Sequence, residues 1–168
     1  MTRWLLIGLG VLVMVALALL VAGMLRPASH EASVSLRLAA PPDSVWRIIS
    51  DIEGQPAWVP QVRAVERLPD NAGRPAYREN FDGFEALTVI TESVPHRKLV
   101  KEILPTGPFS GTWTWELDGD STHTTLAITE RGTVGNVFLR GMMVFHDNEA
   151  SLRAYGAALE RRLVSGER

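Results

Sequence analysis

The sequence predicts an α+β fold, in which an antiparallel sheet of about seven strands wraps around a long C-terminal helix, with one transmembrane helix ahead of the domain. Three features support this prediction. A long apolar run without charges opens the chain, short runs that alternate apolar and polar residues fill its middle, and apolar residues recur at three- and four-residue steps near its end. These patterns are typical of a membrane-spanning helix, of half-buried strands and of an amphipathic helix.

Length and composition limit the classes of protein to which the chain can belong. Its 168 residues suggest one domain. With 17 Lys+Arg, 19 Asp+Glu and a formal net charge of -2, the chain gives no electrostatic reason to expect nucleic acid as a partner. It has no cysteine, which excludes disulfides and thiolate chemistry and fits either side of a membrane.

The opening apolar run extends from Trp4 to Leu25 and has an arginine on each side. As a helix it would be about 33 Å long, which is enough to cross a hydrocarbon core of about 30 Å. We therefore expect residues 1–26 to form a membrane anchor, with Trp4 and Leu25 near its ends. A secretory signal peptide, cleaved near residues 21–23, is the alternative, although the apolar part of a signal usually has only about 7–15 residues.

Charges near the anchor give little information on its orientation, because Arg3 stands before it and Arg26 and Arg37 follow it. A short basic tail before an apolar run favours an amino terminus in the cytoplasm and a domain on the extracytoplasmic side, which is the periplasmic side in a bacterium. After signal cleavage the domain would instead be secreted. Residues 27–32 are expected to be a short linker, so that the domain, residues 33–168, lies close to the membrane.

The domain is expected to begin with a strand and a helix. Ser33 to Leu38 alternates apolar and polar residues, which predicts a half-buried strand. Pro41-Pro42 ends this strand, and Gly54 ends the helix that follows. The apolar stripe of this helix consists of Val45, Ile48, Ile49 and Ile52.

Six further alternating runs predict the remainder of the sheet. Residues with turn chemistry, such as Asp82-Gly83, separate them. Short strands joined by short turns imply an antiparallel meander. The runs are Val62–Leu68, Tyr77–Phe81, Phe84–Glu92, Lys98–Leu104, Gly111–Leu117 and Thr124–Thr129.

The last segment is predicted to be an amphipathic helix. Asn136 is expected to cap its start, and Gly141 or Asp147-Asn148 to kink or split it. The apolar and aromatic positions that recur at helical spacing are Phe138, Met142, Phe145, Leu152, Tyr155, Leu159 and Leu163. A curved sheet and this helix would bury one face of each other.

Four segments together resemble the START/Bet v 1-like helix-grip superfamily, also called SRPBCC or polyketide cyclase/dehydrase-like. The resemblance covers Ser33 to Val164 and implies the helix-grip fold. It implies no single activity, because the superfamily includes lipid carriers, ketide cyclases, aromatases and hormone receptors. The segments are VWRIISDIEGQPAWVPQV (Val45–Val62), GTWTWEL (Gly111–Leu117), TTLAITERG (Thr124–Gly132) and LRAYGAALERRL (Leu152–Leu163).

Aromatic residues predict either a closed core or the wall of a ligand cavity. Trp113 and Trp115 share one face of their strand. Trp58 lies in a segment that Pro56 and Pro60 keep from being regular helix or strand, and it is either core or part of the cavity mouth. The candidate cavity-lining residues are Trp58, Phe81, Phe84, Trp113, Trp115, Phe138, Met142, Phe145, Glu149 and Tyr155.

Polar groups suited to catalysis are sparse. The chain has no His-x-His pair, no Gly-x-Ser-x-Gly elbow and no phosphate loop, so we expect no metal, no cofactor and no assigned catalytic residue. Glu149 is either a cavity-facing acid, base or anchor, or an exposed first-turn residue beside a helix break. Glu79 and Glu130 are in phase with the apolar residues of their strands, but each is near a strand end, so each is either inward-facing or solvated. Lys101 is expected to bury its stem and expose its charge.

Three functions remain open. The first, which we favour, is a non-enzymatic, membrane-tethered domain that binds an apolar molecule such as a lipid, a quinone or a polyketide-like compound. The second is a cyclase- or dehydrase-like enzyme using Glu149, His146, Glu79 or Tyr155, which requires a cavity-facing titratable group held by a polar partner. The third is an interaction module without a ligand.

Overall fold

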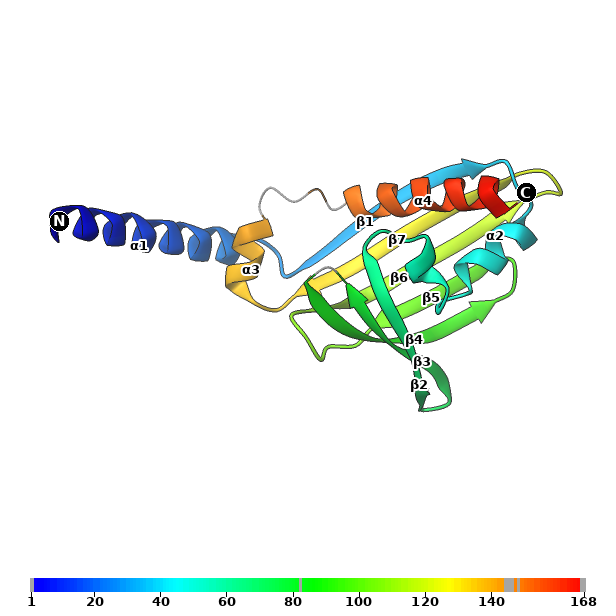
Figure 1. Cartoon of the computed structure of the whole chain (residues 1–168), viewed down its shortest axis with the longest axis horizontal. Coiled ribbons are helices and arrows are strands. Elements are labelled where there is room, and N and C mark those ends of the chain that lie inside the picture. Colours follow the sequence, from blue (N-terminus) through cyan, green and yellow to red (C-terminus); the bar gives the residue numbers. More distant parts are fainter. Residues whose placement is uncertain (1, 82, 144–146, 148, 167–168) are drawn as a thin grey trace.

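The computed structural model describes residues 2–81, 83–143, 147 and 149–166, and its α+β architecture confirms the predicted fold class. Helix α1 (Thr2–Leu25) projects from one end of a domain in which a curved sheet covers helix α4 (Ala150–Gly166), as Figure 1 shows. The short helix α2 (Pro42–Ile49) and the 3-10 turn η1 (Gln55–Ala57) complete the domain on its inner side.

All seven strands pair antiparallel, in the order β1-β7-β6-β5-β4-β3-β2. Strands β2 to β7 follow one another as the predicted meander. Strand β1 pairs with β7 and forms the edge of the sheet opposite β2. The strands are β1 (Ser29–Leu38), β2 (Val62–Asn71), β3 (Arg74–Phe81), β4 (Phe84–Val94), β5 (Lys98–Ile103), β6 (Phe109–Gly119) and β7 (Thr124–Val134).

Strand β1 begins at Ser29, inside the segment that the sequence suggested as a linker. Its register with β7 starts at Ser29 opposite Thr133, so this part of the backbone takes part in the sheet. The alternation continues through Ala32, which is buried, but the small Ala32 and the polar His30 conceal it in the sequence. Helix α1 and the sheet are therefore joined by a very short connection.

The segment predicted as one helix is split, as the sequence allowed, into α3 (Val137–Met142) and α4. Asn136 caps α3 as predicted, because its side-chain oxygen accepts hydrogen bonds from two backbone N–H groups of the first turn, at 2.8 and 3.1 Å. Helix α3 packs on α1 at two glycines, Gly23 and Gly141. A Cβ at Gly23 would overlap the backbone of Val137, and one at Gly141 would overlap the backbone of Leu19.

The apolar core lies between the inner face of the sheet and α4. Leu126 and Ile128 of β7 and Leu152 and Leu159 of α4 are fully buried there, and Ile49 of α2 joins the same cluster. Burial of such side chains stabilises the fold by about 1.5–3 kcal/mol each, so this layer fixes α4 against the sheet. This packing sets the position of α4 relative to the sheet, and therefore the space that remains between them.

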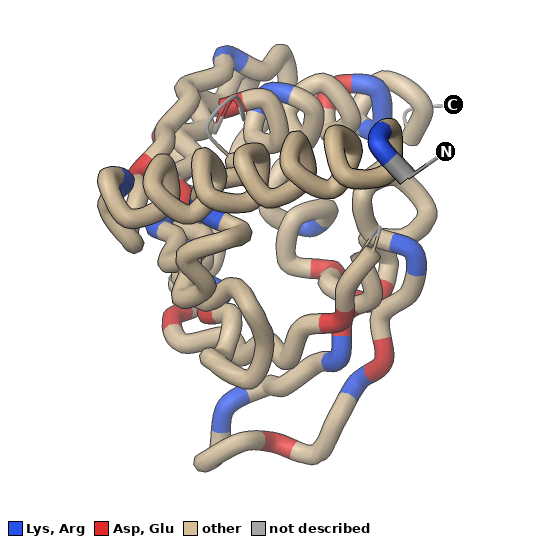
Figure 2. The backbone as a smooth tube through the Cα atoms, turned by 90° about the vertical axis from the view of Figure 1, so that its left-hand side faces the viewer, with Lys and Arg blue, Asp and Glu red and all other residues tan. Residues whose placement is uncertain are grey.

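Helix α1 carries no charge after Arg3, and its tube is accordingly tan beyond its first turn in Figure 2. Within Arg3–Leu25, a window of 18 residues has a mean hydropathy of 3.0, and none of that window is buried within the protein. The helix is long and apolar enough to cross a membrane, although an N-terminal signal sequence would meet the same criteria.

Candidate functional site

A cavity of about 350 Å³ lies between α4 and the sheet, and most of its wall is apolar. The sheet contributes the start of β1, β2, β4 and β6 and the end of β3, β5 and β7, which all meet at the end of the domain next to α1 (Figure 1). The apolar and aromatic side chains of the wall are Val59, Val62, Phe81, Phe84, Ile103, Phe109, Trp113, Trp115, Met143 and Tyr155.

Two glycines of the wall, Gly111 and Gly132, lie opposite each other on β6 and β7. Gly111 has a φ of 149°, and a Cβ at this position would overlap the backbone of Arg131. A Cβ at Gly132 would overlap the imidazole ring of His30. Glycine is therefore required at Gly111, where the clash is with backbone, whereas at Gly132 it makes room for the ring of His30.

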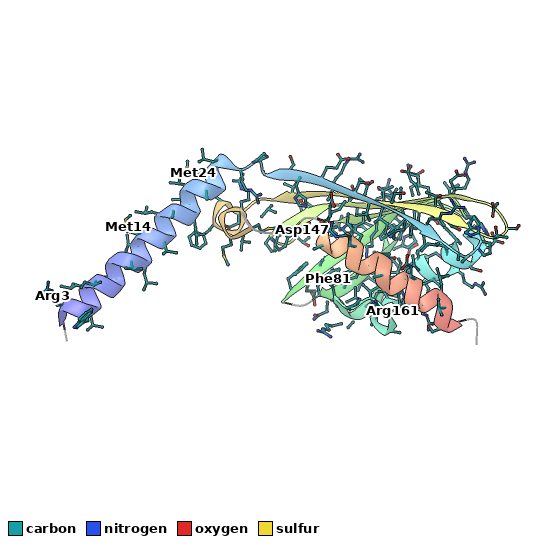
Figure 3. The ribbon with its side chains drawn as sticks, turned by 90° about the horizontal axis from the view of Figure 1, so that it is seen from above. Arg3, Met14, Met24, Phe81, Asp147 and Arg161 are labelled. Atoms are coloured by element: carbon teal, nitrogen blue, oxygen red, sulfur yellow. The ribbon has the colours of Figure 1, made fainter. Side chains whose placement is uncertain are left out.

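Three phenylalanines form the mouth of the cavity, the end of its wall that is only half-buried. The ring centroids of Phe81 and Phe84 are 5.0 Å apart, and those of Phe84 and Phe109 are 5.3 Å apart. In Figure 3, Phe81 lies on the α1 side of Arg161. The mouth therefore lies on the side of the domain from which α1 extends.

The inner end of the cavity is formed by Trp113, Trp115 and Tyr155. Their ring centroids are 5.7–5.9 Å apart in all three pairs, at tilted or edge-on angles. Trp115 is 1% exposed and Tyr155 is 3% exposed, so this end is closed to solvent. Solvent exposure thus falls from the mouth to the inner end.

A buried ion pair supports the wall close to this inner end. Lys101 lines the cavity, and its ammonium nitrogen lies 2.8 Å from Oε2 of Glu79, which is fully buried. The hydroxyl of Thr88 donates a hydrogen bond of 2.6 Å to Oε1 of the same carboxylate. The ammonium also lies 5.9 Å from the centre of the Trp115 ring. The expectation that Lys101 exposes its charge is wrong, because Glu79 compensates the charge inside the protein.

Three residues that line the cavity each contain a buried polar side-chain atom without a hydrogen-bond partner among the described residues. The atoms are Nε2 of Gln55, Nε1 of Trp115 and the hydroxyl of Tyr155. Burial, and then the negative charge of Glu79, raise the pKa of Tyr155 far above its ordinary value of 10.0. The indole of Trp115 is near enough to act on this pKa in the opposite direction, but the two groups do not reach hydrogen-bonding geometry. The phenol therefore stays protonated.

A second pair of titratable groups lies at another part of the wall. Nε2 of His30 is 3.6 Å from Oε1 of Glu130, and both side chains are about one-fifth exposed. Nearby, Arg131 forms an exposed ion pair with Glu31 at 3.0 Å. These groups face partly to solvent, so they are less suited than Lys101 to act on an apolar molecule inside the cavity.

The structure brings half of the predicted cavity residues to the wall. Trp58 instead packs on the core, with its ring 5.0 Å from that of Tyr155 and edge-on to it. The residues that line the cavity are Phe81, Phe84, Trp113, Trp115 and Tyr155.

Three other predicted cavity residues lie elsewhere, which corrects their placement. Phe138 and Met142 are 41% and 60% exposed on α3, because α3 packs on α1 and not on the sheet. Glu149 is exposed and pairs with Arg153 at 2.7 Å, as in the first-turn alternative. Phe145 lies outside the described residues, as does His146.

Sequence reasoning missed Gln55 and the role of Lys101. Gln55 precedes a proline and has no periodic pattern around it, so nothing in the sequence indicates that it is 1% exposed. Lys101 did give a signal, because it is in phase with Leu99 and Ile103 on β5. Its partner Glu79 is two strands away, and only the sheet register brings the two together. Among the described residues, no group of three or more His, Asp or Glu side chains could hold a metal ion.

Comparisons with known proteins agree with this architecture. The family model described as "Polyketide cyclase / dehydrase and lipid transport" matches residues 29–163. The chain is similar in structure to the Zhui aromatase/cyclase from Streptomyces sp. R1128, with a TM-score of 0.71 and 19% identity, over 83% of this chain and 96% of that one. It is also similar to a START superfamily protein from Mycobacterium smegmatis, with a TM-score of 0.65 and 19% identity, over 81% of this chain and 98% of that one.

A third similar structure is that of a protein from Thermus thermophilus, with a TM-score of 0.68 and 19% identity, over 83% of this chain and 100% of the other. At these identities the likeness to solved structures shows the fold alone. No curated protein sequence matches the chain.

Proposed function

Because this chain belongs to the polyketide cyclase/dehydrase and lipid transport family, we propose that it is a membrane-tethered domain that takes an apolar molecule into its cavity. The candidate ligands are a lipid, a quinone or a polyketide-like compound. The observation that carries the proposal is the mostly apolar cavity of about 350 Å³. An engineered apolar cavity of about 150 Å³ already binds benzene, and pockets from about 300 Å³ upward hold drug-sized ligands.

The poor hydration of an empty cavity also supports an occupant. Water would make few hydrogen bonds along a wall of phenylalanines and tryptophans, so an apolar ligand is the better occupant.

The packing of α1 supports a retained anchor over a cleaved signal peptide. Gly23 and Gly141 allow the backbones of α1 and α3 to approach closely, as small residues do between membrane helices. The guanidinium of Arg26 donates a hydrogen bond of 2.6 Å to the backbone oxygen of Met143, which lines the cavity. Cleavage near residues 21–23 would remove the surface on which α3 packs.

The position of the mouth suggests how a ligand would enter. The three phenylalanines of the mouth lie on the side of the domain from which α1 extends, and an apolar ligand partitions into the bilayer that α1 would cross. We therefore propose exchange between bilayer and cavity. The short basic tail before α1 supports a cytoplasmic amino terminus and an extracytoplasmic domain.

A cyclase-like enzyme is the second candidate, because Lys101 on the cavity wall is held by Glu79, which is the kind of pair that such an enzyme requires. Within the described part of the chain, the ammonium of Lys101 makes its hydrogen bond to Glu79 alone. Because the ammonium of Lys101 already donates to Glu79, it is less available to donate a proton to a substrate. This favours ligand binding over catalysis. Turnover of an aromatic polyketide surrogate that is lost in Lys101→Met, while the surrogate still binds, would support the enzyme instead.

Binding of a neutral apolar dye tests the proposed function. Full-length chain in nanodiscs is titrated with N-phenyl-1-naphthylamine, and the signal from empty nanodiscs is subtracted. Ile103→Trp fills the cavity from β5, whereas Val94→Trp adds the same ring at an exposed position on β4 as a control. We expect wild type and the control to bind the dye and Ile103→Trp to lose affinity at least about tenfold. Equal binding by all three chains would contradict the proposal.

A further inference from the structure

Helix α3 packs on α1 within the apolar stretch of α1, not beyond it. Gly141 of α3 lies against the backbone of Leu19. Gly23 of α1 lies against the backbone of Val137 at the start of α3. At a rise of ~1.5 Å per residue, Leu19 and Gly23 lie about 9 and 3 Å before Leu25, the last residue of α1. Helix α3 is therefore level with the last turns of the apolar helix.

The axis of α3 runs across that of α1. Helix α3 is seen end-on in Figure 3, whereas α1 is seen along its length in Figures 1 and 3. Because α1 crosses the bilayer in the proposed function, a helix that runs across it lies along the membrane surface. Helices of this kind bury their apolar face about 5–10 Å into the boundary between headgroups and acyl chains. The depth of α3 on α1 falls in the same range.

The outward face of α3 is apolar. Phe138 and Met142 are four residues apart, which places them on one face of the helix, and both are exposed. Neither side chain belongs to the core cluster or to the cavity wall. In water this face would remain uncovered beside the exposed apolar side chains of α1, whereas lipid acyl chains would cover both.

Two arginines lie where the lipid headgroups would be. Arg140 is the one charged residue of α3, and its guanidinium donates a hydrogen bond of 3.2 Å to the backbone oxygen of Arg26, just past the end of α1. The charge is thus directed toward the aqueous end of α1, as arginine side chains are at membrane interfaces. Within the described part of the chain, neither arginine forms an ion pair. Both positive charges are therefore available to lipid phosphates.

We propose that α3 lies in the interfacial layer of the membrane that α1 crosses, with Phe138 and Met142 among the acyl chains and Arg140 at the headgroups. This inference rests on the membrane anchor of the proposed function and adds a second segment that contacts the bilayer. Met143, which follows α3, lines the cavity. The lipid surface therefore reaches the cavity wall at this residue, and two contacts hold the domain in one orientation.

Spin labels test the depth of α3. Because the chain has no cysteine, each introduced cysteine carries the only label. Phe138→Cys and Met142→Cys place a nitroxide at exposed positions of α3. Val13→Cys places one midway along α1, and Val94→Cys places one on β4 as a control. Power-saturation EPR of the full chain in nanodiscs compares collisions with oxygen, which concentrates among acyl chains, and with a neutral nickel complex, which stays in water.

Oxygen should relax the labels at Val13, Phe138 and Met142 more than the nickel complex does, and the order should reverse at Val94. Photolabelling of the wild-type chain gives a second readout that needs no variant. The probe is a phospholipid with a diazirine on its acyl chain. Mass spectrometry should find adducts on α3 as well as on α1.

The outcomes are distinct. Labels at Phe138 and Met142 that collide mainly with nickel, while the label at Val13 collides with oxygen, would overturn this inference and leave the proposed function standing. Photoadducts confined to α1 would do the same. A label at Met142 that is shielded from both reagents and broadened by a second label would also overturn it, because a second copy of the chain would then cover α3. If the label at Val13 collides mainly with nickel, the membrane anchor fails together with this inference.

Discussion

The ammonium nitrogen of Lys101 lies 2.8 Å from a carboxylate oxygen of Glu79, and both side chains are buried. This pair links β5 to β3 on the inner side of the sheet, and the hydroxyl of Thr88 on β4 donates to the same carboxylate. Three strands are thereby joined by side chains as well as by their backbones. Because Lys101 also lines the cavity, the pair connects the stability of the fold with the chemistry of the site.

Removal of one member of the pair should destabilise the domain strongly. Glu79→Leu leaves the Lys101 charge buried without a partner, and Lys101→Met does the same to Glu79, so each should lower the free energy of unfolding by about 3–5 kcal/mol. Glu79→Leu with Lys101→Met should cost less than either single change. Urea unfolding of the full chain in micelles, followed by tryptophan fluorescence, measures all four chains. Losses that simply add in the double variant would show that the two groups are not coupled.

Alkaline pH should destabilise the domain through Tyr155. Burial raises the pKa of this phenol in the folded state, so above about pH 10 only the unfolded chain releases the proton. The contribution of the protonated Tyr155 to the free energy of unfolding is fully present below about pH 10. Above that pH it is lost by about 1.4 kcal/mol for each pH unit. Tyr155→Phe should therefore reduce the slope of unfolding free energy against pH by this amount.

Tyr77→Phe is the comparison for this measurement, because Tyr77 is the other tyrosine and is only partly buried. Burial raises the pKa of Tyr77 as well, and the guanidinium of Arg67 opposes only part of this rise. The Tyr77→Phe chain should keep more of the alkaline slope than the Tyr155→Phe chain, because the pKa of Tyr155 is raised further. A Tyr155→Phe chain with the full wild-type slope would show that Tyr155 ionises freely in the folded protein.

Contact between α1 and α3 should depend on Gly141. A leucine at this position would overlap the backbone of α1, whereas Gly135, just before α3, has open space around it. Because the chain has no cysteine, Leu139→Cys introduces a single thiol on α3. Its rate of labelling by a maleimide should rise when Gly141→Leu is added and stay unchanged when Gly135→Leu is added. Equal labelling in both backgrounds would argue against helix packing at this point.

The strands were predictable where one face is buried, because apolar and polar residues then alternate, as along β6 and β7. The order of elements, and with it the helix-grip resemblance, followed from these predicted strands. The split between α3 and α4 was harder to predict, since Phe138 and Met142 continue the helical spacing of α4. Their outward position depends on the contact of Gly141 with α1, which sequence spacing cannot reveal.

The site was only partly predictable. Trp113, Trp115 and Tyr155 are large aromatic residues in the correct phase, and phase indicates which face a side chain occupies. Gln55 and Lys101 are buried by residues on other elements, and Lys101 pairs with Glu79 two strands away. No local sequence pattern therefore indicates that these polar side chains are buried. The volume of the cavity also depends on the fit of α4 against the sheet, and similar residues could equally form a closed core.

Native mass spectrometry of the full chain, released from detergent micelles, tests the central claim most directly. The account predicts that part of the wild-type protein carries one non-covalent apolar molecule, that Val94→Trp retains it and that Ile103→Trp does not. A wild-type chain found at its bare mass, with added N-phenyl-1-naphthylamine failing to produce a bound species, would contradict the claim that the cavity holds a ligand.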